Sequence, residues 1–222
     1  MALHNFKMTL AVAATIAVTA TVSTAATFGL VPINGTATTL PASTYSLIEP
    51  VLPFPIISFR DEGSLFGGLF LSGTTANTRL TYTFIGSEAS ATNLSTLALG
   101  SNSFSNATSV NGDNFTTQQT FDDFVDLNFE TNNLSESDFI SNLFGSASDS
   151  RLSIAFSDIS NDPFATSVYA FFGDGAGDND FDDLVLRIDT FEVSEVPLPA
   201  GGILLISALG GLAAARRARR KS

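Results

Sequence analysis

The sequence predicts an all-β fold, an antiparallel and jelly-roll-like β-sandwich with one short helix. Two observations predict it. Short runs rich in Phe, Tyr, Val, Ile and Leu alternate with polar residues, as half-buried strands do, and Gly, Asn, Ser and Asp separate the runs. About eight runs at this spacing favour two antiparallel sheets packed face to face.

The clearest alternation is in Arg79–Gly86, where Leu80, Tyr82 and Phe84 share one face of a strand. Proline-rich residues 27–55 precede it and are expected to be extended, because proline disfavours a helix. The Ser/Thr/Asn-rich stretch Ala89–Gln119 is expected to form long loops or edge strands. The further strands are expected at Ser46–Glu49, Ile56–Arg60, Leu65–Ser72, Leu94–Leu99, Val125–Phe129, Arg151–Asp158, Ser167–Phe172 and Leu184–Val193.

One helix is expected to interrupt the strands and to seal one end of the sandwich. Ser135–Asp138 has the form of a helix N-cap with an acidic side chain in the first turn. Phe139, Ile140, Leu143 and Phe144 follow at helical spacing, and Gly145 ends the pattern.

Residues 1–26 are expected to be a secretory signal peptide. His4 and Lys7 precede an apolar run over residues 8–22, and the small residues 23–26 follow it. A short positive region, an apolar centre and small residues at the cleavage site are the parts of such a peptide. Cleavage is expected near Ala25 or Ala26, with a retained first transmembrane helix as the alternative.

The exported part, residues 27–195, is strongly acidic. It contains all 22 Asp and Glu residues of the chain and only four basic residues, all Arg, so its formal charge is −18. A surface of this sign repels phosphate backbones and anionic lipid, which excludes nucleic acid as a partner. Divalent cations and basic molecules are the natural counterparts.

The same part has no His, Lys, Cys or Trp. This excludes Ser-His-Asp and Cys-His catalysis, lysine Schiff bases, disulfides and the ligands that zinc prefers. We therefore expect a protein that is not an enzyme. A glycoside hydrolase built on two carboxylates is the less favoured alternative, with Asp122, Asp123 and Asp126 as one acidic group that could contribute.

A second acidic group joins two predicted strands, and it is the candidate metal site. Its members are Asp174, Asp178, Asp180, Asp182 and Asp183. Three Gly residues stand among them: Gly173 precedes Asp174, and Gly175 and Gly177 lie between Asp174 and Asp178. Carboxylates so close repel one another unless a cation neutralises them, and Ca2+ takes six to eight oxygen ligands. The sequence therefore predicts Ca2+ here, with a solvated hairpin tip stabilised by Asx turns as the alternative.

The C-terminal segment, residues 196–222, has the features of a sorting signal. Its first residues are Val196, Pro197, Leu198, Pro199 and Ala200. An apolar span from Ala200 to Ala215 and an Arg-rich end follow, and together they resemble the VPLPA variant of the PEP-CTERM sorting signal of Gram-negative bacteria. The resemblance implies recognition of Val196–Ala200 by an exosortase, removal of the tail, and delivery to the cell surface or an extracellular polysaccharide matrix.

Physical arguments agree with an exported domain held by this tail. Arg and Lys beyond the span stay cytoplasmic, which leaves the acidic domain outside. The 16 residues of the span give about 24 Å of helix, short for a permanent transmembrane anchor, although a plain single-pass anchor is the alternative. Residues Asp178–Leu184 also resemble, more loosely, an acidic ending found upstream of such signals.

The sequence therefore predicts an exported, non-catalytic protein of the cell surface or exopolysaccharide matrix, possessing a calcium-stabilised β-sandwich. A secreted carbohydrate-binding, lectin-like module is the alternative, although sugar-binding platforms more often use Trp or Tyr than the Phe that dominates here.

Overall fold

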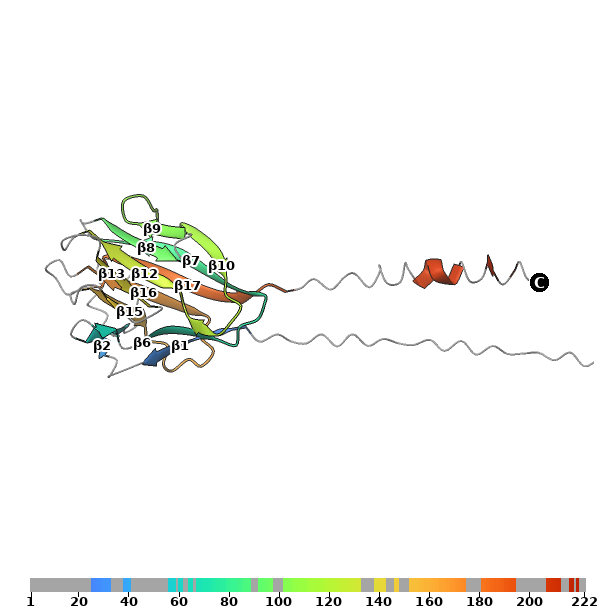
Figure 1. Ribbon diagram of the computed structural model, residues 1–222, viewed down its shortest axis with the longest axis horizontal. Coiled ribbons are helices and arrows are strands. Elements are labelled where there is room, and N and C mark those ends of the chain that lie inside the picture. Colours follow the sequence, from blue (N-terminus) through green and yellow to red (C-terminus); the bar gives the residue numbers. More distant parts are fainter. Residues whose placement is uncertain are drawn as a thin grey trace, which may run out of the picture.

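The computed structural model describes residues 25–32, 38–40, 56–58, 60–61, 64–65, 67–88, 92–97, 102–132, 138–142, 146–147, 152–174, 181–194, 207–212, 216–217 and 219. This part of the chain is almost entirely β-structure, and its strands pair antiparallel (Figure 1). The prediction of an all-β fold is confirmed. Residues 207–212 are helical, and no helix among the described residues is long and apolar enough to cross a membrane.

Seventeen strands are described. They are β1 (Thr27–Pro32), β2 (Thr38–Leu40), β3 (Ile56–Ser58), β4 (Arg60–Asp61), β5 (Ser64–Leu65), β6 (Gly67–Ser72), β7 (Thr78–Gly86), β8 (Asn93–Leu97), β9 (Asn102–Ser105), β10 (Asn114–Gln118), β11 (Asp123–Phe124), β12 (Leu127–Thr131), β13 (Asp138–Ser141), β14 (Ser146–Ala147), β15 (Ser153–Ser157), β16 (Ser167–Gly173) and β17 (Leu184–Glu192). The larger sheets have the orders β10-β7-β17-β16-β15-β3-β2 and β14-β13-β12-β8-β9. Two smaller ones are β1-β6-β11 and β4-β5.

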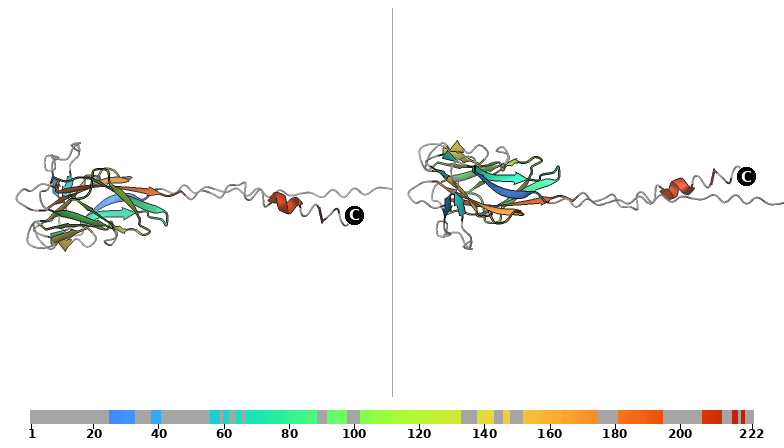
Figure 2. Two further views of the ribbon diagram at one scale, coloured as in Figure 1. Left: turned by 90° about the horizontal axis from the view of Figure 1, so that it is seen from above. Right: turned by 90° about the horizontal axis from the view of Figure 1, so that it is seen from below.

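The two larger sheets pack face to face around an aromatic core, which makes the fold sandwich-like (Figures 1 and 2). Phe129 of β12 stacks on Phe172 of β16, with ring centroids 4.6 Å apart. Phe84 of β7 lies 6.0 Å from Phe104 of β9, again across the two sheets. The alternation that predicted β7 is the inward face of this core, because Leu80, Tyr82 and Phe84 are all buried. Burial also raises the pKa of the Tyr82 hydroxyl.

Asn142 joins the three-stranded sheet to the five-stranded one. Its backbone N–H donates to the carbonyl of Leu127 at 2.8 Å. Its side chain accepts the N–H of Leu69 at 2.8 Å and donates to the carbonyls of Leu69 at 3.0 Å and Val125 at 2.6 Å. The buried side-chain amide of Asn142 thus makes the backbone hydrogen bonds that a neighbouring strand would otherwise make. Gly68 leaves room for it, since a Cβ there would lie 2.0 Å from Asn142 Oδ1.

The predicted helix over residues 135–145 is wrong where the structure describes it, because Asp138–Ser141 is strand β13. The strand pairs with β12 on one side and β14 on the other. Phe139 is 43% exposed and Ile140 is buried, which is the alternation of a strand and not the shared face of a helix. An isolated helix of this length is marginally stable in water. The pairing of β13 with β12 and β14 therefore outweighs the helical preference of the local sequence.

The two ends of the sandwich differ in what they hold. The chain enters β1 and leaves β17 at the same end, as Figure 2 shows from two sides. There a Cβ on Gly73 would lie 3.9 Å from Ala26, and Val193 N–H donates to the Asn77 carbonyl at 3.0 Å. We call this the exit end. The end of β16 and the start of β17 lie at the opposite end, called the far end.

Candidate functional site

The far end brings together three of the five carboxylates predicted to bind a metal. Asp174 follows β16 directly, and Asp182 and Asp183 directly precede β17. All three are buried, with 2%, 1% and 6% of their surface exposed. Asp178 and Asp180 lie outside the described residues, and so does the predicted sorting motif Val196–Ala200. We call the three described carboxylates and the groups that contact them the acidic corner.

Hydrogen bonds to the backbone fix this hairpin. The N–H of Asp174 donates to Asp183 Oδ2 at 2.6 Å, which closes the hairpin across its base. The chain that leaves β7 then holds the other strand: Ser87 Oγ donates to the Asp183 carbonyl, and Glu88 N–H donates to the Asp182 carbonyl at 3.0 Å. The three described carboxylates of the acidic corner are therefore buried and held in place by the fold.

Asn93 brings the opposite sheet to the acidic corner. It is the first residue of β8 and is fully buried. Its Nδ2 lies 3.3 Å from Asp174 Oδ2 and 3.5 Å from the Asp183 carbonyl oxygen, both long for hydrogen bonds. Its Oδ1 is buried and has no hydrogen-bond partner in the described part of the chain. Buried amide oxygens are nearly always satisfied, so Asn93 Oδ1 is a candidate ligand at the acidic corner.

The spacing of these atoms suits a cation ligated by oxygen. A half-turn of the Asn93 amide places Oδ1 where Nδ2 lies, about 3.3 Å from Asp174 Oδ2 and 3.5 Å from the Asp183 carbonyl. Ligands at right angles on a Ca2+ ion with bonds of about 2.4 Å are about 3.4 Å apart. Asn93 could not be picked out as a ligand from the sequence, because its neighbours in the chain are of the same kinds as those of other Asn residues.

The acidic side chains that the structure describes do not complete a metal centre by themselves. Among the described residues no group of three or more His, Cys, Asp or Glu side chains is arranged to hold a metal ion. A calcium site at the acidic corner thus needs oxygens of other kinds. The Asn93 amide and the Asp183 carbonyl are the nearest of these.

The other acidic group does not join the acidic corner. Asp122 lies at the exit end, where its Oδ1 accepts the N–H and the hydroxyl of Thr74, each at 2.8 Å. These bonds, with one from the Gly73 backbone, hold the pKa of Asp122 below its usual value. Asp123 accepts the Phe124 N–H at 2.8 Å, and Asp126 contacts Asn128 at 3.5 Å. Each carboxylate thus contacts its own local partner.

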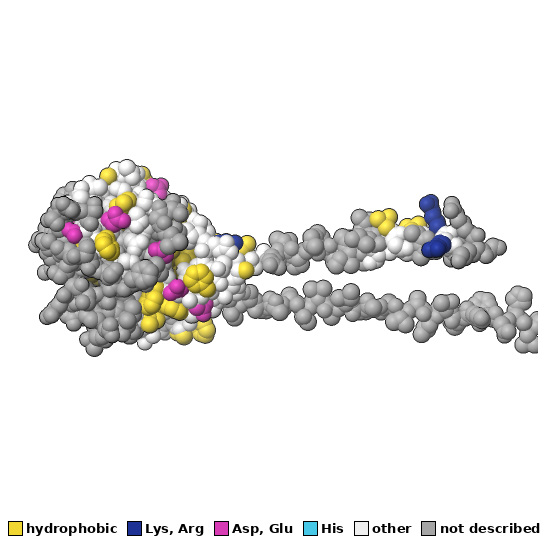
Figure 3. Space-filling view, in the orientation of Figure 1, with side chains coloured by type: hydrophobic (Ala, Val, Ile, Leu, Met, Phe, Trp, Pro, Cys, Tyr) yellow, Lys and Arg dark blue, Asp and Glu magenta, His cyan; other side chains and the backbone are white. Residues whose placement is uncertain are grey.

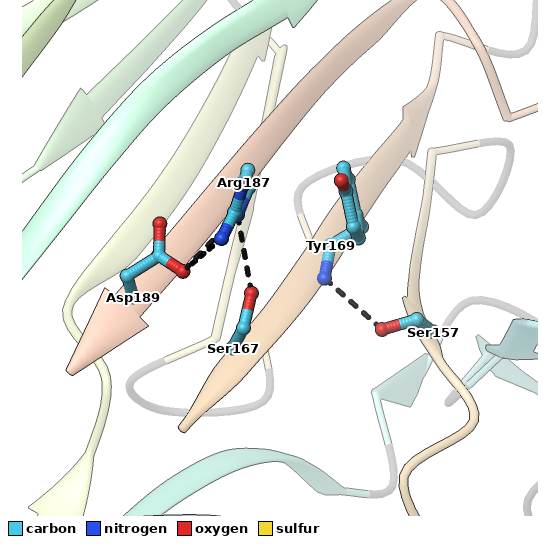
Figure 4. Close-up of polar contacts among 5 residues, drawn as sticks. All are labelled: Ser157, Ser167, Tyr169, Arg187 and Asp189. Carbon is cyan, nitrogen blue, oxygen red and sulfur yellow. Dashed lines mark hydrogen bonds and ion pairs between the residues drawn. The ribbon is translucent and has the colours of Figure 1, made fainter. Parts of the chain in front are cut away.

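The outer face of the seven-stranded sheet carries a row of polar side chains (Figure 4). Arg187 Nε and Nη2 donate to Asp189 Oδ1 at 3.0 and 2.8 Å, and Nε also contacts Ser167 Oγ at 3.2 Å. The Arg187 and Asp189 side chains are 46% and 30% exposed. Tyr169 is half-buried beside them, and its N–H donates to Ser157 Oγ at 3.0 Å. This face offers donors, acceptors and one phenol ring.

The chain matches no protein-family model, no curated protein and no solved structure.

Proposed function

We propose that the protein is an exported, non-catalytic component of the cell surface or exopolysaccharide matrix, with a Ca2+ ion bound at the acidic corner. One observation supports the ion above all others. The buried amide of Asn93 on β8 lies beside the Asp174 carboxylate and the Asp183 carbonyl, and its Oδ1 has no hydrogen-bond partner among the described residues. An ion there neutralises buried charge and ties the two sheets together.

The chemistry of the acidic corner favours Ca2+ over other metals. Its candidate ligands are carboxylate, amide and carbonyl oxygens, which suit a hard cation. The exported part has no His or Cys to select zinc or copper. Flexible ligation at several oxygens also fits Ca2+ better than Mg2+, which demands near-octahedral geometry and keeps its waters.

Delivery follows from the two ends of the chain. Residues 1–26 direct export, and residues 196–222 hold the precursor in the membrane with the acidic domain outside. Val196–Ala200 are the recognition residues for an exosortase-type enzyme, which removes the tail. The sandwich, with jelly-roll-like connections, is then free to join the surface or the matrix.

A second candidate function is binding of polysaccharide on the outer face of the seven-stranded sheet. The observation that favours it is the partly exposed row of Arg187, Asp189 and Tyr169, because a guanidinium, a carboxylate and a phenol ring can bind sugar hydroxyls and stack on a sugar ring. A glycan array probed with the wild-type chain and with Arg187→Ala tests it. Binding that Arg187→Ala leaves intact would place the sugar elsewhere.

The calcium proposal is tested by melting temperature in Ca2+ and in chelator. Ca2+ at about 100 times its dissociation constant stabilises the folded state by about 2.7 kcal/mol, or about 5–10 °C for a chain of this size. Asp183→Asn is expected to abolish this shift while keeping an oxygen that accepts the Asp174 N–H.

The matched control is Asp162→Asn. Asp162 also accepts a backbone N–H, that of Phe164 at 3.0 Å, but it is exposed and lies at the exit end. This variant should keep the full calcium shift. A wild-type chain whose melting temperature is the same in Ca2+ and in chelator would refute the site.

A further inference from the structure

The exit end exposes large apolar side chains. Phe164 is 78% exposed, Phe121 64%, Val193 44% and Phe191 41%. Figure 3 shows hydrophobic side chains, with carboxylates among them, on the half of the domain nearer the C-terminal segment. Rings this exposed are uncommon on a domain that contacts only water, and their grouping indicates an interaction surface.

Hydrogen bonds place these side chains around one turn, Gly73–Asn77. The Thr74 N–H donates to Asp122, which follows Phe121 in the chain. The Asn77 carbonyl accepts the Val193 N–H. The exposed groups on both sides of the turn are therefore fixed by the fold.

Phe164 belongs to the same end. It lies in the loop between β15 and β16, and β16 runs antiparallel to β17. The Thr190 N–H donates to the Thr166 carbonyl at 2.8 Å, so the loop reaches the end of β17 where the chain leaves the sandwich. The exposed ring is thus beside the exit of the tail.

The charges at the exit end select among lipid surfaces. Asp122 accepts two hydrogen bonds from Thr74, and Glu192 accepts the hydroxyls of Thr75 and Thr78. Asp162 and Asp189 are further carboxylates of this end, with Arg79 and Arg187 as the described cations near them. The balance is negative, which disfavours anionic lipid and permits a zwitterionic headgroup layer.

We propose that the exit end rests on the membrane surface while the tail is anchored, with Phe164 and Phe121 in the zwitterionic headgroup layer. The inference depends on the proposed anchoring by residues 196–222. Five residues separate Ser194, the last described residue of the domain, from Ala200, where the apolar span begins. Even fully extended they keep the exit end within about 20 Å of the bilayer, and any slack lets the rings reach it.

This orientation has a consequence for the acidic corner. The nine residues of β7 separate the two ends of the sandwich by about 30 Å. The far end then points away from the membrane, where extracellular Ca2+ and matrix polymers have access.

The test uses a fluorescent label on the full chain, anchored in phosphatidylcholine vesicles. The chain has no Cys, so Phe164→Cys introduces a single site for the polarity-sensitive dye NBD. Val110→Cys is the matched control, because Val110 is also apolar and 66% exposed. It belongs to the turn that contacts Phe84, towards the far end of β7. Spin-labelled lipid headgroups quench NBD on contact, and flotation of the vesicles shows whether the chain is anchored.

We expect severalfold stronger quenching at position 164 than at position 110, and weaker quenching at 164 when phosphatidylglycerol is added. Equal quenching at both positions in a chain that floats would overturn the inference and leave the anchoring intact. A chain that does not float would overturn both. Loss of solvent exposure at position 164 without vesicles, increasing with protein concentration, would assign the surface to a second copy of the chain and overturn the membrane contact.

Discussion

Asn142 connects the three-stranded sheet to the five-stranded sheet, and its replacement by Ala should destabilise the fold strongly. The change removes the acceptor of the Leu69 N–H and a donor to the Val125 carbonyl, both buried. The Leu69 carbonyl keeps the Val125 N–H at 2.9 Å. Two buried backbone groups without partners cost about 1–3 kcal/mol each, so we expect a loss of about 2–6 kcal/mol in the free energy of unfolding.

Gly68 makes this prediction sharper. In the wild-type chain Gly68→Ala brings a Cβ to 2.0 Å from Asn142 Oδ1, and this overlap is expected to cost about 1–3 kcal/mol or more. With Ala at position 142 the nearest remaining atom is the backbone oxygen of that residue at 3.4 Å, an ordinary contact. The second substitution should therefore cost little in the Asn142→Ala background.

The assay is urea unfolding of the four chains of this double-mutant cycle, followed by circular dichroism at a fixed Ca2+ concentration. Asn114→Ala is the control, because its side chain donates to the Gly112 carbonyl at the exposed surface. That variant should change stability by no more than about 0.5 kcal/mol. Additive costs for Gly68→Ala and Asn142→Ala, within about 0.5 kcal/mol, would show that the Asn142 side chain does not limit the space at Gly68.

Two further predictions concern Asp122 at the exit end and the processing of the two chain termini. The folded-state pKa of Asp122 lies below its ordinary value of 3.8, so its hydrogen bonds stabilise the fold above that pH and are lost as pH falls through the lower value. Asp122→Asn should therefore be less stable than wild type at about pH 6 and approach it at about pH 2, and parallel stability curves would contradict this. If the proposed processing takes place, the exported protein should begin at Ala26 or Thr27, because cleavage is expected near Ala25 or Ala26, and it should lack Arg216–Lys221. Its intact mass checks both ends.

The strands that could be predicted are those that carry the core. Buried residues alternate with more exposed ones along the whole of β7 and along parts of β16 and β17, so the period of two is visible in the sequence. The expected ranges Arg79–Gly86, Ser167–Phe172 and Leu184–Val193 differ from these strands by one residue at an end. A strand that is buried on one face shows this period-two pattern, and few other structures produce it.

Other parts of the fold depend on partners distant in the chain. Strands β9 and β10 lie in the Ser/Thr/Asn-rich stretch Ala89–Gln119 and are edge strands of their sheets. The sequence predicted either long loops or edge strands there. Strand β13 was predicted as a helix because Phe139 and Ile140 fit a helical face, and only its pairing with β12 and β14 decides otherwise. The expected strand Ser46–Glu49 lies outside the described residues.

Some residues of the candidate site could be predicted from the sequence and others could not. Asp174, Asp182 and Asp183 stood out because like charges gather within one hairpin. Asn93 did not, because it lies about 80 residues away in the chain and meets them only when the sheets pack. A cluster within one loop can be predicted from the sequence, whereas a ligand that the opposite sheet supplies cannot.

Calorimetric titration of the full chain with Ca2+ at neutral pH is the most direct test for a calcium ion at the acidic corner. We expect heat from a saturable site that Asp174→Asn and Asp183→Asn abolish and that Asn93→Leu weakens, while Asp162→Asn leaves it unchanged. Binding heat that survives Asp183→Asn, or no heat from the wild-type chain, would contradict a calcium ion at the acidic corner.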